Sequence, residues 1–171
     1  MSVGSLSNFA YIMESLEAEW RTVQPPTYFT SVRDAKWPTF PPEATESLTA
    51  TDVAHSVFLW KDRTKRRGSR QENNVELSPV AKVLIAQVLK DTVDVQRQMA
   101  LAEADLIHLM EANPARNHVD NPAGPNNWGL FTRQAAEADI EWMMPKDAQS
   151  YGIGIVWSLW DVEYRHPLPM G

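Results

Sequence analysis

The chain has 171 residues, 43% of them apolar and 22% charged, with a net charge of −6 at pH 7 and no cysteine. This length fits a single domain, 1–171, which can bury roughly two-thirds of its unfolded surface. The missing cysteines exclude disulfides and thiolate chemistry, and the negative charge argues against a general nucleic-acid binder. Without a leader-like segment or a run of 18 apolar residues, we expect neither signal-directed export nor a membrane span.

The first predicted element is an amphipathic helix from Ser7 to Trp20. Pro25 and Pro26 should follow its end, because proline disfavours the α conformation in the residue before it and cannot continue a hydrogen-bonded turn. We expect the next residues, a proline- and aromatic-rich insert at 25–50, to pack over the core as an ordered loop. The helix is predicted from apolar residues at steps of three and four: Phe9, Ile12, Met13, Leu16 and Trp20.

Two strands are predicted next, at 52–60 and 75–89, from their content of β-branched and aliphatic residues. The nearly continuous apolar run within the second strand suits a strand covered on both faces, although a helix is an alternative. Between them we expect a basic hairpin loop at 61–74, mobile in the free protein because it has no large apolar residue before Val75. This loop holds six of the 16 basic residues: Lys61, Arg63, Lys65, Arg66, Arg67 and Arg70.

The clearest element is a helix that begins at Val95 and ends at Asn113, with Thr92 or Asp94 as its N-cap. Its apolar stripe consists of Val95, Met99, Ala102, Leu106, Leu109 and Met110.

Two closing strands, at 128–144 and 151–164, are predicted to form an antiparallel hairpin through the turn at 145–150. The whole order of elements predicts an α+β fold, with a mixed, mostly antiparallel sheet of about four strands and with helices packed on one face. In the last strand, alternation places Tyr151, Ile153, Ile155, Trp157 and Leu159 on one face and Val156, Trp160, Val162 and Tyr164 on the other.

One group of residues in the sequence could carry catalytic chemistry. Glu137, Asp139 and Glu141 share a face of the predicted strand and resemble a carboxylate cluster of a hydrolase or a divalent-metal site. Alternation alone produces the same pattern on any solvated strand. The four histidines, at 55, 108, 118 and 166, do not have metal-ligand spacing. We therefore expect no catalytic residue, no metal and no cofactor.

The chain has seven tryptophans. Trp37, Trp60 and Trp128 fall in predicted loops or at the ends of predicted elements, where a monomer gains least from them. Aromatic residues are enriched at protein interfaces, so these three are candidate interface residues. Packing at the edge of the core is the equally weighted alternative.

From Val53 onward, the order of elements resembles the tail terminator (tail-completion) proteins of long-tailed bacteriophages. The pattern is a hairpin with a long variable loop, a strand leading into a long helix at 80–113, and a closing hairpin that ends in Asp161-Val-Glu-Tyr-Arg-His-Pro-Leu-Pro169. The insert at 25–50 departs from the smaller members of that family.

The resemblance implies a structural virion protein at the head-proximal end of the tail, made in the host cytoplasm. Such proteins form a hexameric ring that caps the tail tube, terminates its polymerisation and joins it to the head connector. The implied partners are other copies of the chain, the tail tube protein and the head-tail connector or stopper protein, with the sheath as a further candidate. DNA passes through such a ring without being specifically bound, and no catalytic residue, cofactor or membrane is implied.

In this setting, Arg63, Lys65, Arg66, Arg67 and Arg70 are expected to contact an acidic surface of the neighbouring subunit or of the tube, because arginine forms paired hydrogen bonds with carboxylates. A solvated hairpin tip is the alternative, and direct DNA binding is a weaker one. Two other functions stay open: another head-tail joining or baseplate structural protein, and a small ligand-binding domain or hydrolase that uses the Glu137, Asp139 and Glu141 face.

Overall fold

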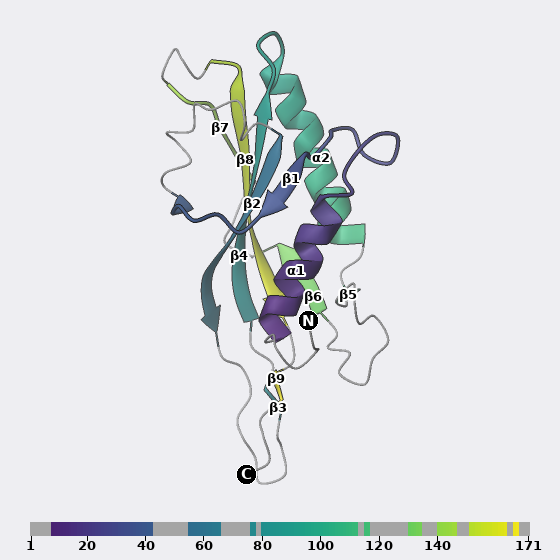
Figure 1. Ribbon diagram of the computed structural model, residues 1–171, viewed down its shortest axis with the longest axis vertical. Helices are drawn as coiled ribbons and strands as arrows, with labels where there is room; N and C mark the ends of the chain where they lie inside the picture. Colours follow the sequence, from purple (N-terminus) through teal and green to yellow (C-terminus); the bar gives the residue numbers. More distant parts are fainter. Residues whose placement is uncertain are drawn as a thin grey trace.

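The computed structural model describes residues 8–42, 55–65, 76–77, 80–112, 115–116, 130–134, 140–146, 151–163 and 166–167. Within these ranges lie two helices, α1 (Asn8–Trp20) and α2 (Val95–Ala112) (Figure 1). The strands are β1 (Asp34–Lys36), β2 (Ser56–Lys65), β3 (Glu76–Leu77), β4 (Val80–Lys90), β5 (Ala115–Arg116), β6 (Leu130–Gln134), β7 (Glu141–Met143), β8 (Ile153–Glu163) and β9 (His166–Pro167).

Seven of the described strands form one mixed sheet in the order β1-β2-β4-β8-β6-β5, with β7 also paired to β8. The β1-β2 pair is parallel, and the other pairs of this sheet are antiparallel. A second sheet pairs β3 with β9. The predicted α+β class with a mostly antiparallel sheet is therefore confirmed. The predicted count of about four strands is too low, because the sequence pattern gives little signal for two- and three-residue strands such as β5 and β1.

Both helices pack on the same face of the sheet, as predicted (Figure 1). We call this the helical face. The main core lies between the two helices and the sheet, and it includes the predicted apolar stripe of α2 and the buried side of α1. Burying one large apolar side chain, such as leucine or methionine, stabilises the fold by about 1.5–3 kcal/mol. The largest fully buried residues of this core are Trp20, Trp160, Met13, Leu16, Leu59, Ile85, Leu89, Met99, Leu106 and Met110.

A second, smaller apolar cluster covers the opposite face, which we call the aromatic face. Its buried members come from β2, β4 and β8, and because β4 contributes residues to both clusters it is covered on both sides. This confirms the prediction of a doubly covered strand. The alternation predicted for β8 is also confirmed, since Ile155 belongs to the aromatic face whereas Val156, Trp160 and Val162 belong to the helical face.

The insert passes from one face of the sheet to the other. Its described part, 25–42, packs over the core as predicted, but it is not all loop, because residues 34–36 form strand β1. Val32 and Ala35 are buried in the core of the helical face, and Tyr28 packs against it. Phe40 packs against the cluster of the aromatic face. The peptide bond between Pro25 and Pro26 is cis. Residues 43–50 lie outside the described residues.

The prediction of one strand over 128–144 is wrong. Two separate strands, β6 and β7, pair with the same edge of β8 at different heights: β6 with Glu163 to Trp160, and β7 with Trp157 to Ile155. Periodicity could not show this division, because each piece continues the alternation only locally. The predicted antiparallel hairpin through the turn before β8 is confirmed by the β7-β8 pairing.

The start of α2 agrees with the predicted N-terminus. The helix begins at Val95, and the backbone carbonyl of Asp94 accepts the N–H of Gln98 at 3.2 Å, as expected for an N-cap residue. Just before it, the Asp91 carboxylate accepts the N–H groups of Val93 and Asp94, each at 2.9 Å. These two backbone hydrogen bonds lower the pKa of Asp91, the bond from Asp94 being the larger effect.

Candidate interaction site

The predicted start of the basic loop at Lys61 is wrong. β2 continues to Lys65, so Arg63 and Lys65 lie in a strand and not in a loop. The registers Lys61 with Val83 and Thr64 with Ala81 show that β2 carries one extra residue between these pairs, which is a β-bulge. After the polar stretch, the bulge restores the packing of side chains toward the core. Because the bulge reverses the alternation of inward and outward side chains, the sequence pattern did not show where the strand ends. Arg66, Arg67 and Arg70 lie outside the described residues.

The second half of β2 presents a free backbone edge. β1 covers the outer edge of β2 only from Ser56 to Phe58, and no other described strand pairs with the edge from Leu59 to Lys65. The side chains of Lys61, Asp62, Arg63 and Lys65 are all exposed. Charged side chains on an open edge prevent non-specific strand pairing, yet they leave the backbone groups available to a complementary partner.

The three candidate tryptophans have different surroundings. Trp37 follows β1, and 46% of its surface is exposed. This exposure leaves Trp37 accessible to a partner, as expected for a candidate interface residue. Trp60 lies inside β2 and is half-buried, so its predicted place at a strand end is wrong. Trp128 lies outside the described residues.

Trp60 belongs to an aromatic cluster on the aromatic face. Its ring stacks on Trp157 of β8 with centroids 5.8 Å apart and an interplanar angle of 21°. Its indole N–H donates a hydrogen bond of 3.0 Å to the carbonyl of Phe40. The Phe40 ring meets Phe58 edge-on with centroids 5.2 Å apart. Such pairs add about 0.5–1.5 kcal/mol each to the burial of the rings, so this cluster holds the insert against the sheet.

Farther along the same face, Lys82 and Asp161 form an ion pair of 3.0 Å between β4 and β8. Both side chains are only 16% exposed. Salt therefore screens this ion pair less than it screens an ion pair on the surface. The two residues are direct register partners, and Lys82 lies opposite the β-bulge of β2. The aromatic face therefore changes from apolar to charged toward the end that carries Arg63.

The opposite border of the sheet is formed in part by β7. Glu141, Trp142 and Met144 are exposed, the last two to 43% and 48%. β7 pairs with β8 on one side, and no described strand pairs with its other side. Of the three carboxylates predicted to share a face, only Glu141 lies in the described part of the chain, whereas Glu137 and Asp139 do not.

A buried carboxylate that the sequence analysis did not single out connects α2 to the insert. Asp105 is 1% exposed and accepts hydrogen bonds from the N–H of Phe29 at 2.8 Å, the N–H of Thr30 at 2.7 Å and the Thr30 hydroxyl at 2.6 Å. Gln87 of β4 donates to the same hydroxyl at 3.2 Å. The sequence did hold a signal for the burial of Asp105, because this residue comes three residues after Ala102 and so lies on the apolar stripe of the helix.

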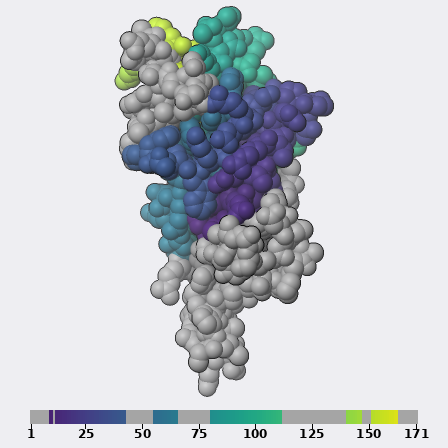
Figure 2. All heavy atoms as spheres, viewed as in Figure 1, coloured from purple at the N-terminus to yellow at the C-terminus, as the bar shows by residue number. Residues whose placement is uncertain are grey.

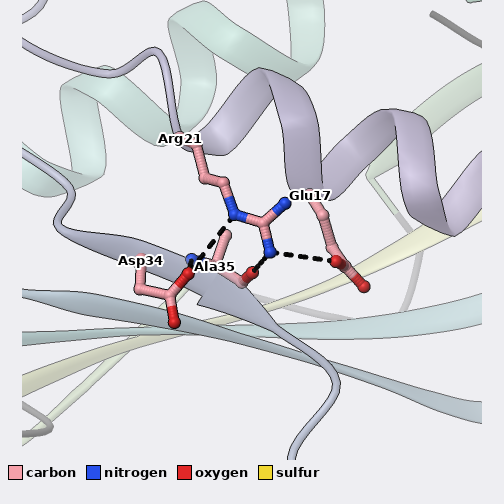
Figure 3. A network of polar contacts seen from close by, with 4 residues as sticks. All are labelled: Glu17, Arg21, Asp34 and Ala35. Carbon is pink, nitrogen blue, oxygen red and sulfur yellow. Dashed lines mark hydrogen bonds and ion pairs between the residues drawn. The ribbon is translucent and has the colours of Figure 1, made fainter. Parts of the chain in front are cut away.

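On the surface of the helical face, Arg21 joins the end of α1 to β1 (Figure 3). Its guanidinium contacts the Glu17 carboxylate at 3.2 Å and the Asp34 carboxylate at 3.3 Å, and it donates to the Ala35 carbonyl at 2.6 Å. Figure 2 shows α1 and the segment up to β1 side by side on this surface.

Burial raises the pKa of the Glu17 carboxyl above its ordinary value of 4.5, against the opposing effect of the Arg21 guanidinium. Because the folded-state pKa is raised, the protonated carboxyl favours folding, and this contribution is lost as the pH rises through the folded pKa. The network is therefore a connection between elements more than a strong source of stability.

Within the described ranges, no group of three histidine or acidic side chains is placed so that it could hold a metal ion. His55 precedes β2 with a φ of 61°, its N–H bonded to the carbonyl of Val88 at 2.7 Å. The exposed His108 ring lies 5.1 Å from Tyr28. His118 is outside the described residues, and His166 lies in β9.

No protein-family model matches the chain, and a search of curated proteins found no match. Neither helix of the described part is apolar enough over a sufficient length to span a membrane.

Proposed function

We propose that this protein is a structural virion protein of the tail terminator kind. It forms a hexameric ring at the head-proximal end of a phage tail, caps the tail tube, terminates tube polymerisation and joins the tail to the head connector. Its partners are further copies of itself, the tail tube protein and the connector or stopper protein, with the sheath as an additional candidate. Its work is done by interfaces, without catalysis or a cofactor.

One observation carries the proposal: the exposed charged and aromatic residues are spread over separate surfaces of one sheet. Arg63 and Lys65 lie on the β2 edge, Glu141 and Trp142 lie on β7, and Trp37 follows β1. Such an arrangement favours contacts with several partners at once, whereas a ligand site gathers polar groups in one concave pocket. Within the described residues, the order β2, β4, α2 and the antiparallel pair β7-β8 is the part of the element order that supports the proposal.

The alternatives are favoured less. Another head-tail joining or baseplate protein would share these surfaces, but the resemblance in element order points to the terminator. A hydrolase would use Glu137, Asp139 and Glu141, and of these three the described residues include only Glu141, which lies exposed on a border strand.

The proposal is tested by adding the purified chain to tail tubes during their polymerisation. We expect tubes to stop growing and to become competent for head joining. Serine at Arg63, Lys65, Arg66, Arg67 and Arg70 should leave the fold intact and weaken attachment most at low salt. The difference from the parent should shrink as the salt concentration rises, because ionic attraction in the parent is screened beyond about 8 Å at physiological ionic strength.

The matched control is Lys146→Ser, an exposed lysine outside the basic segment. Tubes that grow to the same length with and without the protein would contradict the proposal.

A further inference from the structure

We infer that neighbouring copies of this chain join edge to edge, with Leu59–Lys65 of β2 in one copy pairing antiparallel with β7 of the next. The inference rests on the proposed function and specifies the contact that closes the ring. It uses the two borders of the sheet that the described strands leave unpaired.

The β2 border offers seven residues, Leu59–Lys65, whose backbone no described strand pairs with on the outer side. Because β1 occupies Ser56–Phe58, a partner strand must lie toward the Lys65 end. The ammonium group of Lys61 lies 5.9 Å from the Phe9 ring, on the helical face. Arg63 and Lys65 are exposed and have no ion pair with a described carboxylate. Two cations without an ion pair among the described residues therefore mark the border at which the partner must bind.

The charges on this border disfavour pairing with itself. In a two-fold antiparallel contact centred on Asp62, this aspartate would face its own copy and Lys61 would face Arg63. Like charges directly opposite one another on neighbouring strands are destabilising. β7 supplies the opposite charge, because Glu141 is exposed on the other border. The contact is thus head-to-tail, and contacts of this kind generate rings when the rotation closes.

The two side chains also point to the same face. Glu141 is in register with Trp157, which belongs to the aromatic face. Arg63 lies in the bulge opposite Lys82, whose partner Asp161 is on that face as well. When the next copy extends the sheet, Glu141 and Arg63 can therefore meet as a cross-strand pair.

Strand direction agrees with this pairing. β2 and β8 are each antiparallel to β4, so they run in the same direction, and β7 is antiparallel to β8. Copies related by rotation about a ring axis keep the up or down sense of each strand along that axis, even when the strands are tilted to it. β7 of one copy therefore meets β2 of the next as an antiparallel pair, the arrangement with the more favourable hydrogen bonds.

The heights of the two borders differ by an amount that fits a closed ring. Trp142 is level with Val156, Gln87 and Val57, whereas the free edge is centred on Asp62, five residues farther along β2. At about 3.3 Å per residue this offset is about 16 Å, across a sheet width of about 19 Å for four strands. The resulting strand tilt of about 40° lies within the range of closed barrels.

Cysteine cross-linking tests the contact directly, because the parent chain has no cysteine. Arg63→Cys combined with Glu141→Cys, and Lys65→Cys combined with Glu141→Cys, should give disulfide-linked ladders between copies, both free at high concentration and on tail tubes. Paired cross-strand residues have the Cα separation that a disulfide requires. The control pair is Ala100→Cys with Glu141→Cys, since Ala100 is exposed on α2.

Charge reversal provides a second readout. Arg63→Glu alone and Glu141→Arg alone should each weaken self-association about tenfold or more, and the two together should restore it. Arg97→Glu on the exposed side of α2 should have little effect. No ladder from either pair in either setting, or no recovery in the double variant, would overturn the inference.

The outcomes separate the two proposals. Rings that form without sensitivity to either reversal contradict the strand pairing and leave the terminator function standing. A chain that cross-links as expected but does not stop tube growth supports the strand pairing and contradicts the function.

Discussion

At the residue scale, the buried polar groups determine how the insert is attached. A carboxylate that is 1% exposed must have its charge compensated by hydrogen bonds. Asp105 receives three, all from Phe29 and Thr30, which lie about 75 positions earlier in the chain. One side chain on α2 thereby fixes the path of a segment without regular structure. The insert reaches β1, and thus the border of the sheet, from this point.

Asp105→Asn is expected to lower the free energy of unfolding by about 2–3 kcal/mol. The amide keeps the shape but loses the charge and presents an N–H group to three donors, and charge-assisted hydrogen bonds of this kind contribute about 1.5–3 kcal/mol. Urea denaturation measures the difference. Glu111→Gln, an exposed change on the same helix, should stay within about 0.5 kcal/mol of the parent. Equal stability of Asp105→Asn and the parent would show that the network does not hold the insert.

At the element scale, α2 approaches β8 most closely at Gly154. A β-carbon at this position would lie 2.8 Å from Cγ of Met99 and 2.9 Å from Cγ2 of Val95, both on the helix. The glycine at position 154 is thus explained by close packing and not by backbone conformation. Of the two glycines in the described residues, Gly152 at the preceding turn is the one with a positive φ, of 85°. The approach of α2 to the sheet sets the thickness of the core on the helical face.

Gly154→Ala should destabilise the protein by about 1–3 kcal/mol, because an added methyl group forces the packed helix or its side chains to move. In the background of Met99→Ala the same change should cost less, since the crowded side chain is gone. Thermal or chemical denaturation of the four proteins gives the coupling energy. An equal cost in both backgrounds would show that Met99 is not what the added methyl group meets.

Much of the fold follows from periodicity, and the exceptions have physical causes. The two helices and the doubly covered strand β4 were predictable because each buries a continuous apolar pattern. The bulge in β2 reverses alternation, so Arg63 and Lys65 were assigned to a loop although they lie in a strand. β1 was missed because three residues in parallel pairing carry too little pattern. The free borders depend on strand order, which a local pattern does not encode.

At the scale of the whole molecule, the sheet has a helical face, an aromatic face and two unlike borders. The helical face and the aromatic face are both covered by side chains of the chain itself. The borders are where β2 and β7 are left unpaired by the described strands, one bearing Arg63 and Lys65 and the other Glu141. A molecule with complementary ends suits a closed assembly of identical copies.

Electron cryo-microscopy of completed tails tests this account most directly. The account predicts a ring of six copies at the head-proximal end of the tube, with β2 of each copy beside β7 of its neighbour. A two-fold dimer, or a ring at the opposite end of the tail, would contradict it.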